Sequence, residues 1–361
     1  MRGYYHTKYS GKRKSGNKYR RFFLWAVLVI IILMTPVVWL GYKAAFEPNV
    51  YTAGAEESYL TIPTGSNFDD VKKELYLHGM IIHRKSFEWI AGLKKYDKMI
   101  KPGRYKLTPD MGSLELVNLL RSGKQAPVKV IFNNIRTPDQ LAGRISGQIE
   151  ADSLSIINLL NDSSYLDSLG VTRNSLYTII IPNTYEFYWN TNARSFINRM
   201  KSEADKFWNS DRTKKLAYLH LNKHEVITLA SIVEKETNKN DERPRVAGVY
   251  LNRLEKGWLL EADPTLVFAH GNFEMRRVLN IHKQIDSPYN TYKYKGLPPG
   301  PICLPSVSSI DAVLNREQHN FMFFCAREDF SGYHNFARTL EQHNLNAFKY
   351  QQALNRRNIY K

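Results

Sequence analysis

Two glutamates near the end of one expected helix have the residue type and the spacing for acid–base chemistry. Asn222 opens a capping box, and apolar residues recur behind it at helical spacing, which predicts a helix over residues 222–237. At about 100° per residue, Glu234 and Glu236 lie at the two margins of its apolar face, whereas Lys235 points away. Partial burial of a carboxyl group raises its pKa, which suits a general acid at neutral pH.

The helical periodicity does not choose between Glu234 and Glu236. A charged run of this kind also fits a solvated helix end at which both carboxylates pair with nearby lysines. Lys223, Lys235 and Lys239 are the candidates for such pairs. The sequence around the helix therefore has to decide between these alternatives.

Six motifs follow one another in a fixed order through the second half of the chain. They comprise residues 229–237, 246–254, 263–265, 287–292, 296–302, and 334–336 with 343–344. Together they resemble the YceG/MltG family of membrane-anchored endolytic murein transglycosylases. The residue pattern predicts strands at 58–62, 103–107 and 128–132 within a small module over 58–132. This module, with its turn and strand at 101–105, resembles the LysM-like subdomain of that family. The resemblance covers nearly the whole chain.

The resemblance implies a catalytic role for one of the two glutamates. The residue of the family that matches Glu234 is its catalytic acid, so Glu234 is expected to protonate the glycosidic oxygen between N-acetylmuramic acid and N-acetylglucosamine. It then takes a proton from the C6 hydroxyl of the muramic acid, which closes on C1 to give a 1,6-anhydro end. Glu236 is the next candidate for the acid, and no cofactor is expected.

The remaining motifs are expected to form the walls of a glycan groove. The expected substrate-binding residues are Glu236, Asp263, Tyr289, Asn290, Thr291, Pro299, His334 and Asn344. Alternatives stay open: Asp263 also fits a helix cap, and Asn290 and Thr291 also fit a turn. His334 and His343 lack a carboxylate partner at a metal-type spacing, which favours structural hydrogen bonding and no metal site.

Two positions depart from the usual pattern of the family. Asn183 stands where an aspartate is common, and Ser306 replaces a glycine. The second change is expected to alter one loop of the groove, and neither is expected to touch Glu234.

An apolar run near the start of the chain predicts a single membrane span. Residues 22–40 carry no charge and are long enough to cross a bilayer, and the span is placed at 22–42. Eight basic residues and no acidic ones precede it, so the positive-inside rule places the N-terminus in the cytoplasm. The body then lies outside the inner membrane. A signal peptide cleaved near residues 53–55 is the alternative, but the apolar run is longer than such peptides have.

The net charge of +17 would ordinarily suggest a nucleic-acid partner. Outside the cytoplasm the charge fits attraction to anionic lipid and polymer better, so no nucleic acid is expected. The expected partners are glycan strands, the bilayer and, as a hypothesis, peptidoglycan synthases. Cys303 and Cys325 fit one disulfide or two separate thiols equally well.

The expected fold class is α+β, in an ordered series of parts. These are a basic arm at 1–21, the transmembrane helix at 22–42, a linker at 43–57, the LysM-like subdomain at 58–132, a mainly helical connecting region at 133–221, and a mixed α+β catalytic domain at 222–361. Two rivals to the transglycosylase share this layout. One is a scaffold that binds peptidoglycan without cutting it, and the other is a muramidase that uses water.

Overall fold

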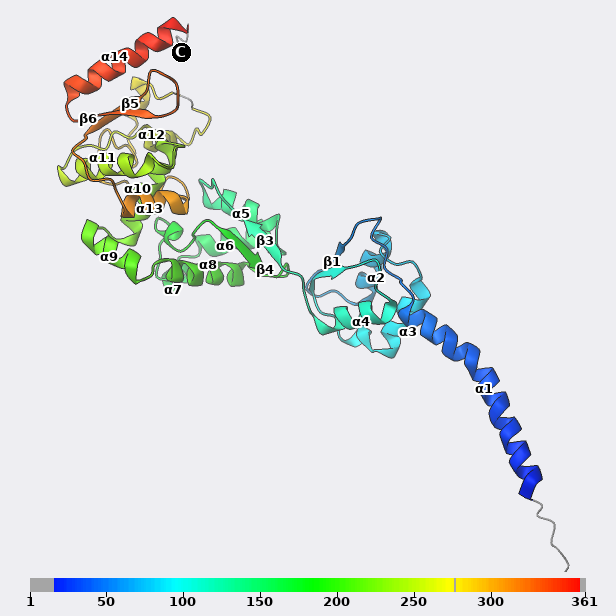
Figure 1. The fold of residues 1–361 in the computed structure, drawn as a ribbon. Helices are drawn as coiled ribbons and strands as arrows, with labels where there is room; N and C mark the ends of the chain where they lie inside the picture. The colour runs from blue at the N-terminus through cyan, green and yellow to red at the C-terminus, as the bar shows by residue number, and fades with distance from the viewer. Residues whose placement is uncertain (1–15, 276, 358–361) are drawn as a thin grey trace, which may run out of the picture. The chain divides into compact units, whose positions relative to one another are not determined.

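The computed structural model describes residues 16–275 and 277–357, which divide into two compact units between Ala126 and Pro127 (Figure 1). Most of the expected basic arm lies outside the described residues. Helices and short strands mix in both units, so the α+β class is confirmed.

The first unit begins with the long helix α1, Gly16–Phe46. Residues 18–46 of this helix are long and apolar enough to cross a membrane, and none of the most apolar stretch is buried in the protein. Pro36 lies inside the helix, where the Thr35 hydroxyl donates to the Ile31 carbonyl at 2.7 Å. The expected span is therefore a continuous helix that extends beyond the predicted 22–42 at both ends.

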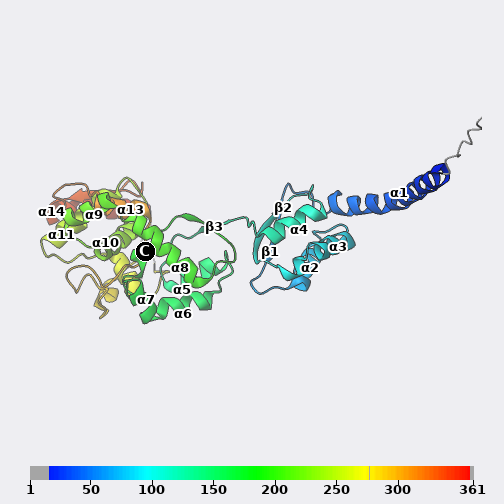
Figure 2. The same cartoon turned by 90° about the horizontal axis from the view of Figure 1, so that it is seen from below.

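The rest of the first unit consists of three helices and a two-stranded antiparallel ribbon (Figure 2). Leu60 pairs with Tyr105 in the register, and both are buried. The elements are β1 Ser58–Ile62, α2 Phe68–Leu77, α3 Arg84–Leu93, the 3-10 turn Tyr96–Lys98, β2 Gly103–Leu107 and α4 Ser113–Ser122. The likeness of this unit to LysM domains stays a prediction.

The segment expected as a linker, 43–57, differs from that expectation. Asn49 and Val50 are buried, and the Asn49 amide donates to Ser113 Oγ at 2.9 Å. Gly112 permits this packing, because a Cβ there would meet the Ala45 carbonyl oxygen at 2.7 Å. The chain therefore enters the small unit directly from α1.

The second unit has one hydrophobic core that spans the expected connecting region and the expected catalytic domain. Strand β3, Val128–Ile131, was expected in the small module, but it pairs antiparallel with β4, Thr184–Phe187, in the second unit. The pairing aligns Val130 with Tyr185 and holds residues 127–187 to the larger core. The boundary between the two units therefore falls at 126 and 127, not after 132.

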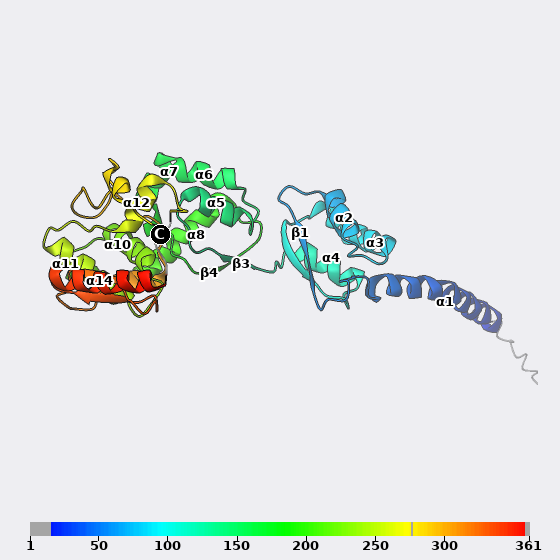
Figure 3. The same cartoon turned by 90° about the horizontal axis from the view of Figure 1, so that it is seen from above.

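Helices make up most of the second unit, and α14 lies on the opposite side of it from α6 and α7 (Figure 3). The elements are α5 Pro138–Ser146, α6 Ser153–Asn161, α7 Ser163–Ser168, the 3-10 turn Leu176–Thr178, α8 Ala193–Phe207, α9 Ser210–Leu219, α10 Lys223–Glu236, α11 Arg243–Glu255, α12 Asp263–His270, the 3-10 helix Asn280–Gln284, α13 Val307–Leu314, β5 Phe323–Ala326, β6 His334–Ala337 and α14 Leu340–Arg356. Strands β5 and β6 form an antiparallel pair.

Candidate active site

Helix α10 positions both candidate glutamates in its last turn. The predicted capping box is confirmed: the Asn222 side chain accepts from Glu225 N at 3.0 Å, and the Glu225 carboxylate accepts from Asn222 N at 2.8 Å. Every residue from Val226 to Val233 is buried, so the helix lies deep in the unit. Its end at Glu236 then places Glu234 and Glu236 where the core meets solvent, and both are half-buried.

Glu234 is held by the start of helix α13. Its Oε2 accepts from Ser306 N at 3.2 Å, Ser306 Oγ at 2.5 Å and Ser309 Oγ at 2.5 Å. Arg243 Nη1, from a buried side chain on α11, lies 3.4 Å from the same oxygen. The Glu234 side chain is 22% exposed. These contacts come from two helices that pack against α10.

The pKa of Glu234 follows from these partners. Burial alone would raise it, but the hydrogen bonds from Ser306 and Ser309 and the charge of Arg243 outweigh burial and hold the pKa below its ordinary value. The expectation that burial keeps Glu234 protonated is therefore wrong. The expectation that Ser306 leaves Glu234 untouched is also wrong, since Ser306 supplies two of its donors.

Glu236 has the opposite electrostatic environment. Burial raises its pKa to about 7, and although the Tyr250 hydroxyl lowers it, the nearby charge of Asp263 raises it again. Tyr250 is buried on α11, and its hydroxyl donates to Glu236 Oε1 at 2.6 Å. A large fraction of Glu236 is therefore still protonated near pH 7, which is the property that sequence reasoning had assigned to Glu234.

Glu236 lies between two cavities of about 360 Å³ each, and Asp263 lines both of them. We name them by one residue each. The Arg136 cavity is lined by Arg136, Lys235, Phe268, Phe273, Arg277 and Ile302, among others. The Tyr250 cavity is lined by Tyr250, Arg253, Tyr292, Phe324, His334 and His343, among others. Glu234 is not one of the described residues that line these two cavities.

Asp263 faces this site and does not cap helix α12. The N-cap residue is Ala262, and it makes no side-chain cap bond. The Tyr292 hydroxyl donates to Asp263 Oδ1 at 2.6 Å. Burial, together with this bond, raises the pKa of the Tyr292 hydroxyl well above its ordinary value. Of the two roles weighed for Asp263, the structure favours the one within the groove.

Several residues expected to bind substrate are internal instead. The Asn290 side chain is fully buried and donates to the carbonyls of Lys283 at 2.9 Å and Ile285 at 2.8 Å. Thr291 Oγ1 lies 2.9 Å from Thr265 Oγ1 and accepts from Ala262 N at 3.0 Å. Both residues build the loop that carries Tyr292, so they have the turn role that was kept as an alternative.

The other expected groove residues divide in the same way. The Tyr289 ring packs on Phe268, with ring centroids 4.7 Å apart. Pro299 is exposed, and its carbonyl oxygen lies 2.9 Å from His224 Nε2. Asn344 is exposed on α14, and neither it nor Pro299 is among the described residues that line the two cavities. His334 does line the Tyr250 cavity.

His334, on β6, is held by the carboxylate of Glu242, the residue directly before α11. Its Nδ1 lies 2.7 Å from Glu242 Oε2, and its backbone N–H donates to Glu242 Oε1 at 2.8 Å. Thr237 Oγ1 donates to the same carboxylate at 3.1 Å. Within residues 16–275 and 277–357, no three His, Cys, Asp or Glu side chains are placed to hold a metal ion. Cys303 and Cys325 are both free thiols.

Sequence reasoning missed three residues that surround Glu236: Tyr250, Tyr292 and Arg253. Tyr250 and Arg253 belong to the 246–254 motif, and Tyr292 ends the 287–292 motif. Their position in the recognised motifs indicated that they belong to the site. Which side chain of a motif faces the cavities depends on how α11 and the 287–292 loop pack, and the sequence does not give this packing.

Most of this chain is similar in sequence to known proteins. Residues 60–349 match the YceG-like family. An endolytic murein transglycosylase of Streptococcus pneumoniae is 28% identical over 341 residues, covering 84% of this chain and 61% of that protein. One of Bacillus subtilis is 27% identical over 307 residues, covering 81% of this chain and 84% of that protein. This chain therefore spans less than two thirds of the length of the pneumococcal relative.

A solved structure agrees with the fold. The crystal structure of a YceG-like protein from Listeria monocytogenes is 29% identical in sequence, with a TM-score of 0.56. The match covers 80% of this chain and 98% of that one.

Proposed function

This chain belongs to the YceG-like family, and from that premise we propose that it is a membrane-anchored endolytic transglycosylase of bacterial cell-wall glycan. It cleaves the β-1,4 bond between N-acetylmuramic acid and N-acetylglucosamine and leaves a 1,6-anhydro end. The two relatives described above, which are named endolytic murein transglycosylases, support this activity. A carboxyl group that lines two cavities, and whose pKa burial raises to about 7, supports it independently.

We assign the catalytic acid to Glu236 in place of Glu234. A general acid must carry its proton at the working pH, and burial gives Glu236 a pKa of about 7. The Glu234 carboxylate is charged, is bound by Ser306, Ser309 and Arg243, and lies outside both cavities. The contrast between these two environments is the observation that carries the proposal. Glu234 then joins α10 to α13 and positions the end of the helix.

The reaction needs only one carboxylic acid that acts twice. Glu236 first gives its proton to the glycosidic oxygen as the bond from that oxygen to C1 of the muramic acid breaks. The resulting carboxylate then removes the proton from the C6 hydroxyl of the same sugar. The C6 oxygen bonds to C1, so the proton returns to Glu236 and no water is consumed.

Two neighbours prepare Glu236 for these steps. The Tyr250 hydroxyl, at 2.6 Å, fixes the carboxyl group in one orientation and stabilises its charged form in the second step. Asp263 raises the pKa of Glu236 and supplies a negative charge close to the oxocarbenium-like centre. Tyr292 holds Asp263 in place through its own hydroxyl.

The glycan lies across Glu236 with a sugar in each cavity. Both cavities include Glu236 and Asp263, so a strand that fills the two places its scissile bond beside the acid. The Arg136 cavity presents Arg136, Lys235 and Arg277 near an apolar wall, and the Tyr250 cavity presents aromatic and imidazole groups. Hydrogen-bonding groups beside aromatic faces suit sugar hydroxyls and acetamido groups.

The cellular setting follows from α1. The helix anchors the protein in the inner membrane with its N-terminus in the cytoplasm, because basic residues precede the span. The second unit then works on the outer side, where the cell wall is. Newly made strands that are still close to their synthases are the substrates nearest to the membrane, and the synthases are the proposed protein partners.

The proposal is tested by the products of the full chain in detergent acting on purified glycan strands, analysed by mass spectrometry. Fragments with anhydro ends are expected. Fragments heavier by the mass of one water would identify a muramidase, and binding without any cleavage would identify a scaffold.

A further inference from the structure

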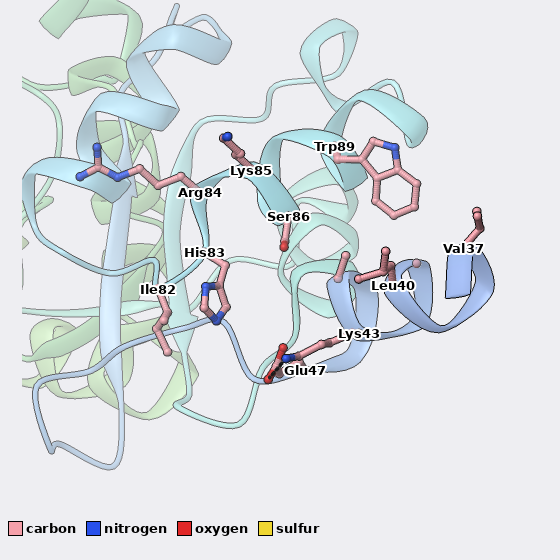
Figure 4. Close-up of a pocket in the computed structure, with 12 residues that line it drawn as sticks. Val37, Leu40, Lys43, Glu47, Ile82, His83, Arg84, Lys85, Ser86 and Trp89 are labelled. Carbon is pink, nitrogen blue, oxygen red and sulfur yellow. Dashed lines mark ion pairs between the residues drawn. The ribbon is translucent and has the colours of Figure 1, made fainter. Parts of the chain in front are cut away.

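Helix α3 packs against the outer end of the membrane span. The outermost carbon of the Trp89 indole lies 3.5 Å from the point where a Cβ on Gly41 would be. Ile81, eight residues before Trp89, forms a β-bridge with Val50, and Val50 follows the C-terminal end of α1. Helix α3 therefore runs antiparallel to the end of α1 and approaches the span as it proceeds. Figure 4 shows the same course, with Trp89 near Val37 and His83 near Lys43 and Glu47.

This course carries the end of α3 to the level of the bilayer surface. The apolar run of α1 ends at Leu40, and Lys43 is the first charged residue after it, so Trp89 lies level with the edge of the apolar segment. At 1.5 Å per residue, Leu93 lies about 6 Å further along, which corresponds to the level of Val37. The last turn of α3 therefore reaches the depth at which lipid headgroups give way to hydrocarbon.

The residues at this depth have the composition of a membrane-surface contact. Trp89 is 50% exposed and Leu93 is 62% exposed, although both are large and apolar. On α1, Trp39 and Tyr42 are also exposed at the same level. Tryptophan and tyrosine favour the interface between lipid and water. Two lysines, 94 and 95, follow Leu93 directly, and long basic side chains reach from such a position to anionic headgroups.

A groove between the two helices continues this surface. It has a volume of about 760 Å³. Its walls come from Val37, Leu40 and Gly41 on α1 and from Ser86 and Trp89 on α3. Lys43, Arg84 and Lys85 stand at the end away from the span, together with one acidic residue, Glu47, which pairs with Lys43 at 3.5 Å (Figure 4). An apolar wall that continues from the lipid-facing side of a span, with a cationic rim, matches an acyl chain and a phosphate headgroup.

We propose that the last turn of α3, with Trp89, Leu93, Lys94 and Lys95, docks on the outer leaflet, and that anionic phospholipid fills the groove beside it. The small unit is thereby fixed against the membrane through a second contact besides the span. This proposal does not rest on the catalytic function.

The insertion of Trp89 is tested with the full chain in lipid nanodiscs. The fluorescence of Trp89 is obtained by subtracting the emission spectrum of Trp89→Phe from that of the wild type. Lipids brominated near the headgroup end of their acyl chains serve as the quencher. A matched control is Leu77→Trp in the Trp89→Phe background. Leu77 is exposed on α2, near Met80, whose carbonyl binds Tyr51 N beyond the end of α1.

The Trp89 emission is expected to be quenched to the degree seen for Trp39, and the emission of the residue 77 control is expected to stay unquenched. Trp89 emission that is unquenched and red-shifted, as at residue 77, would overturn the proposal. A blue-shifted but unquenched Trp89 would also overturn it, because the groove would then be covered by protein.

The role of the lysines is tested by replacing part of the neutral lipid with phosphatidylglycerol. Quenching of Trp89 is expected to increase with the anionic lipid in the wild type, and Lys94→Gln/Lys95→Gln is expected to lose this increase. Lys73→Gln/Lys124→Gln changes the charge of the same unit equally at exposed positions and is expected to keep it. The proposal fails if quenching in the Lys94→Gln/Lys95→Gln variant increases as it does in the wild type. It also fails if the anionic lipid does not increase quenching in the wild type.

Discussion

The Tyr250 hydroxyl donates a hydrogen bond of 2.6 Å to Glu236 Oε1, joining the middle of α11 to the last turn of α10. Tyr250 is buried and its bond favours the charged form of Glu236, so it opposes the effect of burial on the pKa. The proton affinity of Glu236 is therefore a balance between neighbours that can be changed one at a time.

Removal of this hydroxyl is expected to raise the pKa of Glu236. Because the acid must be protonated to act, activity is lost as the pH rises through that pKa. In Tyr250→Phe the alkaline limb of kcat/KM should move to higher pH. The rate below the limb should fall by roughly 10- to 100-fold, since a hydrogen bond to a charged group contributes about 1.5 to 3 kcal/mol. An alkaline limb at the wild-type pH would show that Tyr250 does not act through Glu236.

Asp263→Asn is expected to shift the same limb in the opposite direction. The negative charge of Asp263 raises the pKa of Glu236, so a neutral amide at this position should lower it. The alkaline limb of the pH profile should then move to lower pH, and the rate should fall because the charge near the oxocarbenium-like centre is lost. A limb that stays in place, or that moves as in Tyr250→Phe, would argue against this arrangement.

Glu234 is expected to matter for stability more than for chemistry. Its pKa in the folded protein is below its ordinary value, so its contribution is present above the unfolded pKa and is lost as the pH falls through the folded one. Glu234→Gln should lower the free energy of unfolding by about 1 to 3 kcal/mol at pH 7, because Arg243 loses its carboxylate partner. Thermal unfolding of the second unit at neutral and acid pH measures this, and the difference should shrink in acid.

Two glycines within helices are expected to respond to alanine substitution in opposite ways. A Cβ on Gly248 in α11 would lie 2.6 Å from the Glu317 carbonyl oxygen and 2.6 Å from His319 Nε2, whereas one on Gly143 in α5 would meet nothing within 4 Å. Gly248→Ala should destabilise the protein by about 1 to 3 kcal/mol through overpacking. Gly143→Ala should stabilise it by about 0.5 to 1 kcal/mol. Denaturation midpoints compare the two, and equal shifts would contradict the packing described here.

Local signals in the sequence were enough to predict many elements. Strands 58–62 and 103–107 have the predicted bounds, and the capping box at Asn222 places the start of α10 correctly. In each case the alternation, spacing or cap lies within a few residues of the element. The charge-free run likewise predicted α1, although its ends extend further than expected.

The choice between Glu234 and Glu236 could not be made in this way. It depends on Ser306, 72 residues after Glu234, and on Arg243, which reaches back from the next helix. Helical periodicity places both carboxyls at a margin of the apolar face, but only the packing of α13 supplies donors to one of them. The resemblance pointed to Glu234, and the electrostatics of the folded unit favour Glu236.

Long-range packing also explains the misplaced boundaries. Strand 128–131 has the same local pattern whichever partner it takes, and its partner, β4, lies more than 50 residues further along. The segment after α1 carries the turn-rich composition of a linker, yet it is buried because Gly112 lets the backbone approach closely.

The central claim, that Glu236 is the acid, is tested most directly by comparing Glu236→Gln and Glu234→Gln of the full chain on purified glycan strands. The measurement is the rate at which 1,6-anhydro ends form, at a temperature where both variants are folded. Glu236→Gln should lose a factor of about 10² to 10⁴ or more, while Glu234→Gln keeps most of the wild-type rate. An active Glu236→Gln beside an inactive Glu234→Gln would contradict the account and return the acid to Glu234.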